Sequence, residues 1–528
     1  MSKAQKVLIA GQWRDSEAVG TFEPNNPSTR QPTGEVYPVS GEKEVVEAVE
    51  AAAVASEQLQ AFYPDGVADF IDAFADRIEA RADEIVAMAN TESGLPASPR
   101  LADIELPRTT SQLRQAATAA RTHSWSSPTI DTTSNIRSMY SALEGGVAVF
   151  GPNNFPLAFN SVSGGDFAAA IGAGCPAIGK ANSSHPGTSR LLAEEALEAL
   201  KATGLPLATV QLIYRTEHDV GMKLVSHAKI GATGYTGSRS AGLALKAAAD
   251  TAGKPIYLEL SSINPVYILP GALQERSEAI ADDFGTSCLM GTGQFCTNPG
   301  IVVLQKGSDT DTFIGQVKER FEAAPVGTLL AEGVETGMSR SVTTLQKAGA
   351  ELLTGGSAAA GTGYSFSNTL LKVAGEKFLQ DPETLQTEAF GNESLFIVVD
   401  DLDQACEVAR HFEGNLTGCI YSHSDGTDDG AYDRIAPLLR RKVGRLLNDK
   451  MPTGVAVVPS MNHGGPYPAT GHPGFTAVGI PASLLRFGML SCYDNVRDNR
   501  LPAVLRDKNP GGVARLIDGE WTTGDVSA

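Results

Sequence analysis

From residue 145 onward, short apolar runs alternate with helical stretches, and this alternation limits the fold more than any other feature. The runs are Val147–Phe150, Ala177–Lys180, Val210–Tyr214 and Lys229–Tyr235. Alternating β and α units predict a parallel, doubly wound sheet. A second set of runs follows at 265–269, 301–304 and 395–399. The sequence therefore predicts an α/β protein with two doubly wound domains, which suits a length of 528 residues.

Two segments lie outside this alternation. Between about residues 42 and 122, apolar residues recur at helical spacing, as in Phe70, Phe74 and Ile78, which predicts a layer of helices. A polar stretch at 126–133 then leads into a segment at 137–142 that we expect to extend away from the main body as a strand. Such a strand is a candidate for pairing with another subunit.

Composition bears on partners and location. The chain has 42 Lys and Arg against 61 Asp and Glu, and this net charge of −19 opposes binding to nucleic acid and to anionic membranes. No stretch approaches the ~20 apolar residues that a membrane span needs, so we expect a cytoplasmic protein. The six cysteines lack paired spacing, so we expect neither disulfides nor a zinc site, and no metal.

One cysteine stands in a loop that suits a reactive thiol. Cys296 lies in the Gly-rich turn 293–300, where its sulfur can be open to a ligand. The strand-like run 255–260 carries Glu259 at its end, so a nucleophile and a base both have candidates. From residue type alone, a buried structural cysteine is the more common alternative.

Two loops at predicted strand ends carry further polar groups. Asn154 follows the strand at 147–150, and its side-chain amide could donate to an oxyanion or simply belong to a Pro-Asn turn. Lys180 ends the next strand and Ser183 follows it. An ammonium and a hydroxyl at one strand end suit a ribose or a phosphate, although a solvated lysine is the alternative.

Two later loops complete the candidate site. Ser238 stands where a strand leads into a helix, so it either faces a bound phosphate or acts only as an N-cap. This loop lacks the GxGxxG fingerprint of many dinucleotide sites. The segment 387–392 carries Glu388 and Phe390 side by side, and by itself it predicts no function.

Taken together and in this order, the loops resemble the aldehyde dehydrogenase superfamily, from Gly11-Gln12-Trp13 to about residue 490. The resemblance implies that Cys296 is the nucleophile, Glu259 the base and Asn154 an oxyanion donor. It also implies a dinucleotide cofactor. Lys180 and Ser183 would contact its adenosine ribose or a phosphate there, Ser238 its pyrophosphate, Glu388 its nicotinamide ribose, and Phe390 would pack beside the nicotinamide.

Departures from the common family pattern narrow the expectation. Most members have two glycines after the base, whereas this chain has Ser261-Ser262. Many members have Glu where this chain has Ser183, and a neutral serine admits a 2′-phosphate that Glu would repel. We therefore expect NADP, with NAD as the alternative, and Arg215 is either a cation for that phosphate or a surface residue.

These departures resemble the branch that holds α-ketoglutaric semialdehyde dehydrogenases and some NADP-linked fatty aldehyde dehydrogenases. We expect oxidation of α-ketoglutaric semialdehyde, with a fatty or other aliphatic aldehyde as the alternative. Polar residues at 297–298 and 460–463 are compatible with a small acid, while His463 is expected only to shape the entrance. A cofactor-independent thiol hydrolase or acyltransferase is the competing class.

The resemblance also implies a division of the chain. Residues 1–125 and 145–259 would bind the dinucleotide, and residues 260–485 would form the catalytic domain. Residues 126–144, with about 486–528, would form an oligomerisation element and a tail, giving a homodimer or homotetramer. The tail beyond about residue 505 has no predicted function.

Overall fold

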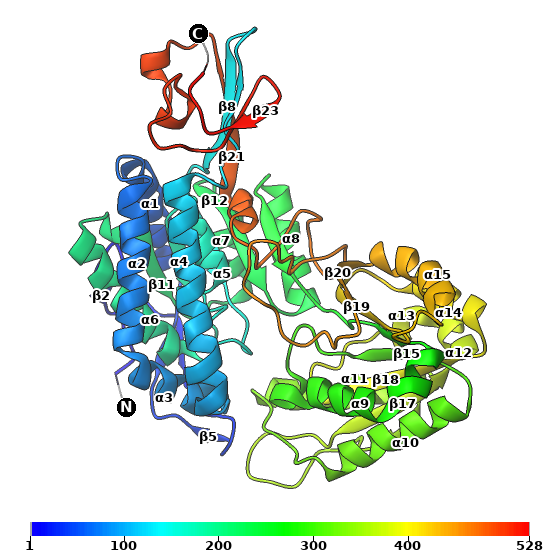
Figure 1. Cartoon of the computed structure of the whole chain (residues 1–528). Helices are drawn as coiled ribbons and strands as arrows, with labels where there is room; N and C mark the ends of the chain where they lie inside the picture. Colours follow the sequence, from blue (N-terminus) through cyan, green and yellow to red (C-terminus); the bar gives the residue numbers. More distant parts are fainter. Residues whose placement is uncertain (1–2, 527–528) are drawn as a thin grey trace.

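The computed structural model describes residues 3–526, and its first large sheet has seven strands in the order β13-β12-β9-β10-β11-β1-β2 (Figure 1). The parallel strands are β9 (Gly146–Phe150), β10 (Ala177–Lys180), β11 (Val210–Ile213), β12 (Ile230–Thr236) and β13 (Ile256–Glu259). A hairpin of β1 (Val7–Ile9) and β2 (Gln12–Arg14) extends one edge. After β11 the chain crosses to the other side of β9, and such a switch point is where open α/β sheets bind ligands.

Helices cover both faces of this sheet. On one face lie α5 (Gly165–Gly172) and α6 (Pro186–Thr203), and on the other α1 (Glu42–Leu59), α7 (His218–Ser226) and α8 (Arg239–Thr251). Outside α5 and α6 pack α2 (Asp65–Ala80), α3 (Ala82–Ser93) and α4 (Leu106–Thr122). The predicted helical layer therefore exists.

The second large sheet also has seven strands, in the order β16-β17-β18-β15-β14-β19-β20. Its strands are β14 (Val266–Ile268), β15 (Ile301–Gln305), β16 (Glu351–Thr354), β17 (Thr369–Ala374), β18 (Glu393–Val399), β19 (Asn415–Tyr421) and β20 (Val443–Asn448). Only the edge strand β16 pairs antiparallel. The predicted α/β class with two doubly wound units is confirmed.

Helices again flank the second sheet (Figure 1). They are α9 (Pro270–Leu289), α10 (Ser308–Ala323), α11 (Glu332–Lys347), α12 (Gly375–Gln380), α13 (Pro382–Leu385), α14 (Leu402–His411) and α15 (Asp429–Arg440). One core lies on the α9 and α10 side, around Phe284 and Phe313. The other lies on the α14 and α15 side, so the sheet is buried on both faces, as parallel sheets require.

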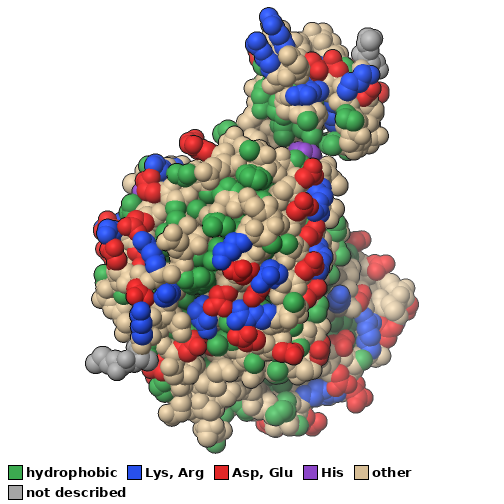
Figure 2. Space-filling model, turned by 90° about the vertical axis from the view of Figure 1, so that its left-hand side faces the viewer, with side chains coloured by type: hydrophobic (Ala, Val, Ile, Leu, Met, Phe, Trp, Pro, Cys, Tyr) green, Lys and Arg blue, Asp and Glu red, His purple; other side chains and the backbone are tan. Residues whose placement is uncertain are grey.

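A third sheet stands clear of the main body (Figures 1 and 2). Its order is β21 (Gly488–Asp494), β8 (Ile136–Ala142), β7 (Thr129–Asp131), β22 (Arg515–Ile517) and β23 (Glu520–Thr522). The extended segment predicted at 137–142 is thus a strand. It pairs along its whole length with β21, an edge strand whose Met489 and Leu490 are 53% and 58% exposed.

The remaining strands form two small ladders near the N-terminus. They are β3 (Gly20–Phe22) with β6 (Tyr37–Val39), and β4 (Asn25–Asn26) with β5 (Gln31–Pro32). The face drawn in Figure 2 mixes acidic and basic side chains. Within residues 3–526, no helix has both the length and the apolar character to cross a bilayer.

Candidate active site

One cavity of about 1080 Å³ brings the predicted site residues together. Loops that follow strands of the first sheet line one part of it, and segments of the second domain line the rest. Its lining includes Asn154, Lys180, Ser183, Arg215, Ser238, Glu259, Cys296, Glu388 and Phe390. Residues spread over more than two hundred positions of sequence therefore share one site.

The loop that carries Cys296 depends on a glycine. Gly293 has a φ of +68°, and a Cβ there would lie 2.1 Å from the carbonyl oxygen of Gly391. Any other residue would push the two backbones apart. The same close approach sets the Cys296 loop against the segment that carries Glu388 and Phe390.

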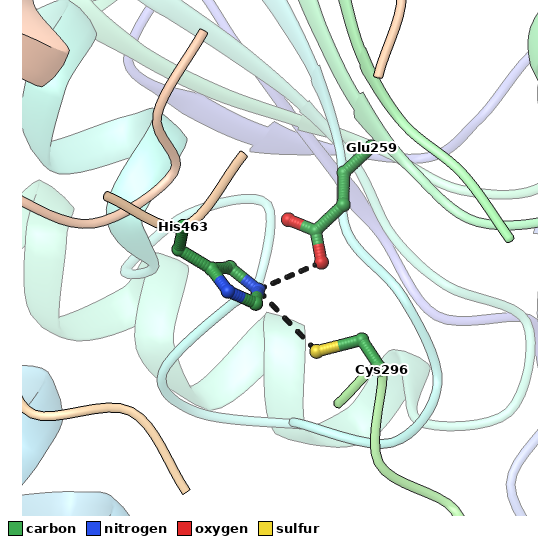
Figure 3. A group of neighbouring side chains, drawn as sticks. All are labelled: Glu259, Cys296 and His463. Carbon is green, nitrogen blue, oxygen red and sulfur yellow. Dashed lines mark hydrogen bonds and ion pairs between the residues drawn. The ribbon is translucent and has the colours of Figure 1, made fainter. Parts of the chain in front are cut away.

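Cys296, His463 and Glu259 form a contact chain (Figure 3). The Nε2 atom of His463 lies 3.3 Å from Cys296 Sγ and 2.9 Å from Glu259 Oε1. Glu259 is 1% exposed and His463 2%. Among the described residues, Glu259 Oε2 has no hydrogen-bond partner, so one carboxylate oxygen holds the imidazole and the other is available to a bound molecule. The three ligand atoms lie within 4.8 Å of one another and could also hold a metal ion.

The electrostatic surroundings keep Cys296 protonated at rest. Burial, and next the negative charge of Glu259, raise the pKa of the Cys296 thiol well above its usual range. The cation of Arg108 acts in the opposite direction but does not reverse the shift. The nucleophilic thiolate must therefore form by proton transfer within the site, and the imidazole of His463 is in contact with the sulfur.

Asn154 lies beside the nucleophile loop. Its Nδ2 donates to the carbonyl oxygen of Gln294 at 2.9 Å, two residues before Cys296. No second acceptor for this amide occurs among residues 3–526, so one N–H can serve a ligand. This arrangement suits stabilisation of an oxyanion formed at the sulfur.

The opposite part of the cavity carries cations. Lys180 ends β10, and burial together with the neighbouring charge of Arg215 lowers its pKa to about 8. Arg215 itself is exposed. Ser183 lines the cavity between the ends of β10 and α6, so no carboxylate occupies that position. An anionic group bound here would find two adjacent positive charges.

Ser238 and Glu388 hold intermediate positions in the cavity. Ser238 is the N-cap of α8, since its Oγ accepts from the N–H of Ala241 at 3.4 Å, and this helix N-terminus borders the cavity. Both predicted roles of Ser238 are thus compatible. Glu388 Oε1 accepts from the N–H of Ser262 at 3.3 Å, while burial raises the pKa of Glu388 to about 7. Phe390 lines the cavity nearby.

The prediction that His463 only shapes the entrance is wrong. The residue is buried between the nucleophile and the carboxylate. Its loop runs back along the first sheet, where Leu260 donates its N–H to Ala469 O at 2.8 Å. The sequence signal was a histidine in a Gly- and Pro-rich segment, which indicates a loop but not its destination.

Asn264 was also missed. It adopts a φ of +49°, and its Nδ2 donates to Cys296 O at 2.9 Å and to Asn298 O at 2.8 Å. Its Oδ1 lies 2.8 Å from Ser262 Oγ, which gives the serine that departs from the family pattern a structural role. Asn298 is likewise held internally, by Gly391 O at 3.3 Å, and this loop does not offer that amide to a substrate.

A half-buried thiol in contact with an imidazole that also contacts a carboxylate, at a cavity beside a doubly wound sheet, defines a thiol enzyme with room for a dinucleotide. The chain belongs to the aldehyde dehydrogenase family, whose model matches residues 13–444. It is therefore an oxidoreductase, and enzymes of this family use NAD or NADP.

Relatives cover nearly the whole chain. It is 37% identical to alpha-ketoglutaric semialdehyde dehydrogenase 2 of Azospirillum brasilense, over 97% of this chain and 98% of the relative. It is 35% identical to alpha-ketoglutaric semialdehyde dehydrogenase of Acinetobacter baylyi, over 98% of each. Lactaldehyde dehydrogenase of Escherichia coli has the same fold, with a TM-score of 0.78, 22% identity and coverage of 93% of this chain and 98% of that one.

Proposed function

We propose that this enzyme oxidises α-ketoglutaric semialdehyde to 2-oxoglutarate with NADP. The observation that carries the chemistry is the contact chain Cys296–His463–Glu259, whose Cys296 and Glu259 line one cavity together with Asn154. The substrate is proposed from the two full-length relatives with that name. NADP is proposed because two cations and a neutral serine line the other part of the cavity.

The nucleophile acts first. In the tautomer that carries its proton on Nδ1, His463 takes the thiol proton of Cys296 on Nε2, and the N–H formed there donates to Glu259 Oε1, which stabilises the imidazolium. The thiolate attacks the aldehyde carbon, and the carbonyl oxygen becomes an oxyanion. Asn154 Nδ2 and the backbone N–H of Cys296 donate to that oxyanion, leaving a thiohemiacetal on the sulfur.

The cavity fits a dinucleotide. Its volume, the N-terminus of α8 at Ser238 and the cation of Lys180 suit phosphate groups and a ribose. Lys180 and Ser183 would hold the adenosine ribose and its 2′-phosphate, and Glu388 and Phe390 the nicotinamide end. When bound, the dinucleotide supplies an acceptor for the hydride of the aldehyde.

Hydrolysis of the acyl-thioester completes the reaction. Glu259 Oε2 is without a partner and is suited to take a proton from water. The hydroxide attacks the acyl carbon, the carbon–sulfur bond breaks, and Cys296 leaves as thiolate. A base is needed because the pKa of free water lies far above neutral pH.

A fatty aldehyde is the second candidate substrate. The side of the site near Cys296 holds an apolar cluster that includes Phe155, Phe159 and Phe475. Apolar side chains of this kind suit contact with an alkyl chain. Membership of a dehydrogenase family argues against the alternative of a thiol hydrolase.

Absorbance of reduced nicotinamide tests these proposals directly. Purified enzyme is mixed with α-ketoglutaric semialdehyde or decanal, each with NADP and with NAD. We expect rapid reduction of NADP with the keto-acid aldehyde. Preference for decanal would reject the keto-acid substrate in favour of a fatty aldehyde. Preference for NAD would reject the cofactor proposal. No reduction of NADP or NAD with any of a wide panel of aldehydes would reject the oxidation itself.

The assembly and the domain division are proposed together. We propose a cytoplasmic homodimer or homotetramer joined through the third sheet, whose edge strand β21 exposes Met489 and Leu490. Strand membership supports residues 1–125 and 145–259 as the cofactor domain and 260–485 as the catalytic domain. It likewise supports 126–144 with 486–528 as the oligomerisation element. The free cysteines suit reducing conditions.

A further inference from the structure

Arg108 is an arginine without a partner beside the reacting sulfur. It lies in the first turn of α4, and its Nε and Nη2 are shielded from solvent. Neither atom has a hydrogen-bond partner among residues 3–526, and no salt bridge to its guanidinium occurs there. A buried donor left without an acceptor is destabilising, and a charged donor more so. The position is therefore unfavourable unless a ligand completes it.

Aromatic rings hold this guanidinium in place. Its Cζ lies 5.5 Å from the ring centre of Phe155 and 5.3 Å from that of Phe159. Phe159 in turn packs against the ring of His463, with centroids 6.0 Å apart. The cation is thus linked by contact to the catalytic chain. Rings on the guanidinium favour its charge but leave its in-plane N–H groups free for a planar anion.

Neighbouring arginines show how unusual this is. Arg100 lies over Phe155 as well, but it pairs with Glu105 and donates to Asn154 O at 3.0 Å. Arg445, also near the sulfur, donates to Gly454 O at 3.2 Å and to Pro452 O at 2.7 Å. Both have acceptors from the protein, whereas Arg108 has none among the residues that the structure describes.

The charge of Arg108 acts on the reacting groups. Its cation opposes the rise in the pKa of the Cys296 thiol, and Cys296 and Glu259 both act on its own pKa. Burial is nevertheless the largest influence and lowers the pKa of Arg108. An anion bound to the guanidinium would remove this desolvation cost.

We propose that Arg108 binds the carboxylate of the substrate and thereby selects aldehydes that carry an acid at the far end. This inference rests on the proposed function and deepens it. In this arrangement the rings of Phe155 and Phe159 would lie along the carbon chain, and the guanidinium beside them would offer its planar fork of N–H donors to the carboxylate. An uncharged aldehyde would leave that donor unpaired, so the same residue both attracts acids and disfavours alkyl aldehydes.

The experiment compares two five-carbon aldehydes, α-ketoglutaric semialdehyde and pentanal, in wild type and Arg108→Met. We expect KM for the acid to rise roughly 100-fold in the variant, with a smaller change in kcat. For pentanal we expect kcat/KM to stay level or to rise, because the variant removes the donor that an alkyl aldehyde leaves unpaired. Arg114→Met is the matched control, since Arg114 lies in the same helix but pairs at the surface with Glu79 and Asp76. Arg114→Met should leave KM and kcat unchanged for both aldehydes.

Arg108→Lys keeps the charge but not the planar fork, and we expect it to recover part of the lost affinity for the acid. An equal loss for both aldehydes in Arg108→Met would overturn the proposal, and so would an unchanged ratio. If that variant does not fold, Arg108→Lys and the wild type decide the question. The wild type must prefer 5-oxopentanoate to its methyl ester roughly 100-fold, and Arg108→Lys must narrow that preference.

The failure of this inference differs from the failure of the proposed function. Wild type that reduces neither NADP nor NAD with any aldehyde would reject the oxidation itself. Wild type that oxidises both aldehydes, with a variant that keeps the preference for acids, would reject only the role of Arg108.

Discussion

The two ends of the cavity are built in opposite ways. At the catalytic end, His463 contacts both Cys296 and Glu259; His463 and Glu259 are buried, and Cys296 is half-buried. At the other end, Lys180 and Arg215 influence each other only through charge, and Arg215 is exposed. The first end depends on distances between atoms, whereas the second depends on the sign of the charge. Substitutions should therefore cause large losses of activity at the catalytic end and smaller, graded changes at the end that carries Lys180 and Arg215.

The largest effect should come from Cys296→Ala. We expect the oxidation rate to fall at least roughly 10,000-fold, because no other group can form the thiohemiacetal. Binding of the dinucleotide, followed by fluorescence titration, should remain within a few-fold of wild type. An active Cys296→Ala variant would show that oxidation does not depend on this thiol.

His463→Gln tests the middle of the contact chain. Glutamine can still hydrogen-bond but cannot take a proton, so we expect kcat to fall about 100-fold, within the range for a general base. Alkylation of Cys296 by iodoacetamide should slow in parallel, and its pH profile should move upward. A normal alkylation rate would show that the imidazole does not activate the thiol.

Ser183→Glu tests the opposite end. The new carboxylate would face the proposed 2′-phosphate, and like charges in contact cost about 2 kcal/mol or more. We expect kcat/KM for NADP to fall about 30-fold, while kcat/KM for NAD stays level or improves. Ser184→Glu is the neighbouring control and should alter the ratio less. An equal change for both cofactors would argue against a phosphate at this position.

The smallest effect is the pH dependence of cofactor binding. Burial and Arg215 lower the pKa of Lys180 to about 8, so its ammonium is charged below that pH and lost above it. A phosphate prefers the charged form. KM for NADP should therefore rise as pH passes through 8, by at most about tenfold between pH 7 and 9. KM for NAD measured in parallel should stay nearly flat, and parallel curves would contradict the assignment.

Sequence reasoning succeeded where the signal is local. Apolar runs and helical spacing predicted the layers, and Cys296, Glu259 and Ser238 each stand at a strand end or in a Gly-rich loop. His463 and Arg108 lack such signals. Their positions follow from packing between segments 167 to 204 residues apart, or between α4 and the aromatic cluster. A local pattern cannot encode which distant loop a buried side chain will meet.

The third sheet can be completed only late in synthesis of the chain. Ser141 of β8 contacts Ser491 of β21, 350 residues later in the chain. At roughly 5–20 residues per second, β8 leaves the ribosome roughly 20–70 s before its partner strand is made. During that interval the nascent chain carries an open strand edge, while both large sheets can already form. Completion of this sheet is therefore among the last steps of folding, and a slow or stalled ribosome prolongs exposure of a strand edge that can pair with the wrong chain.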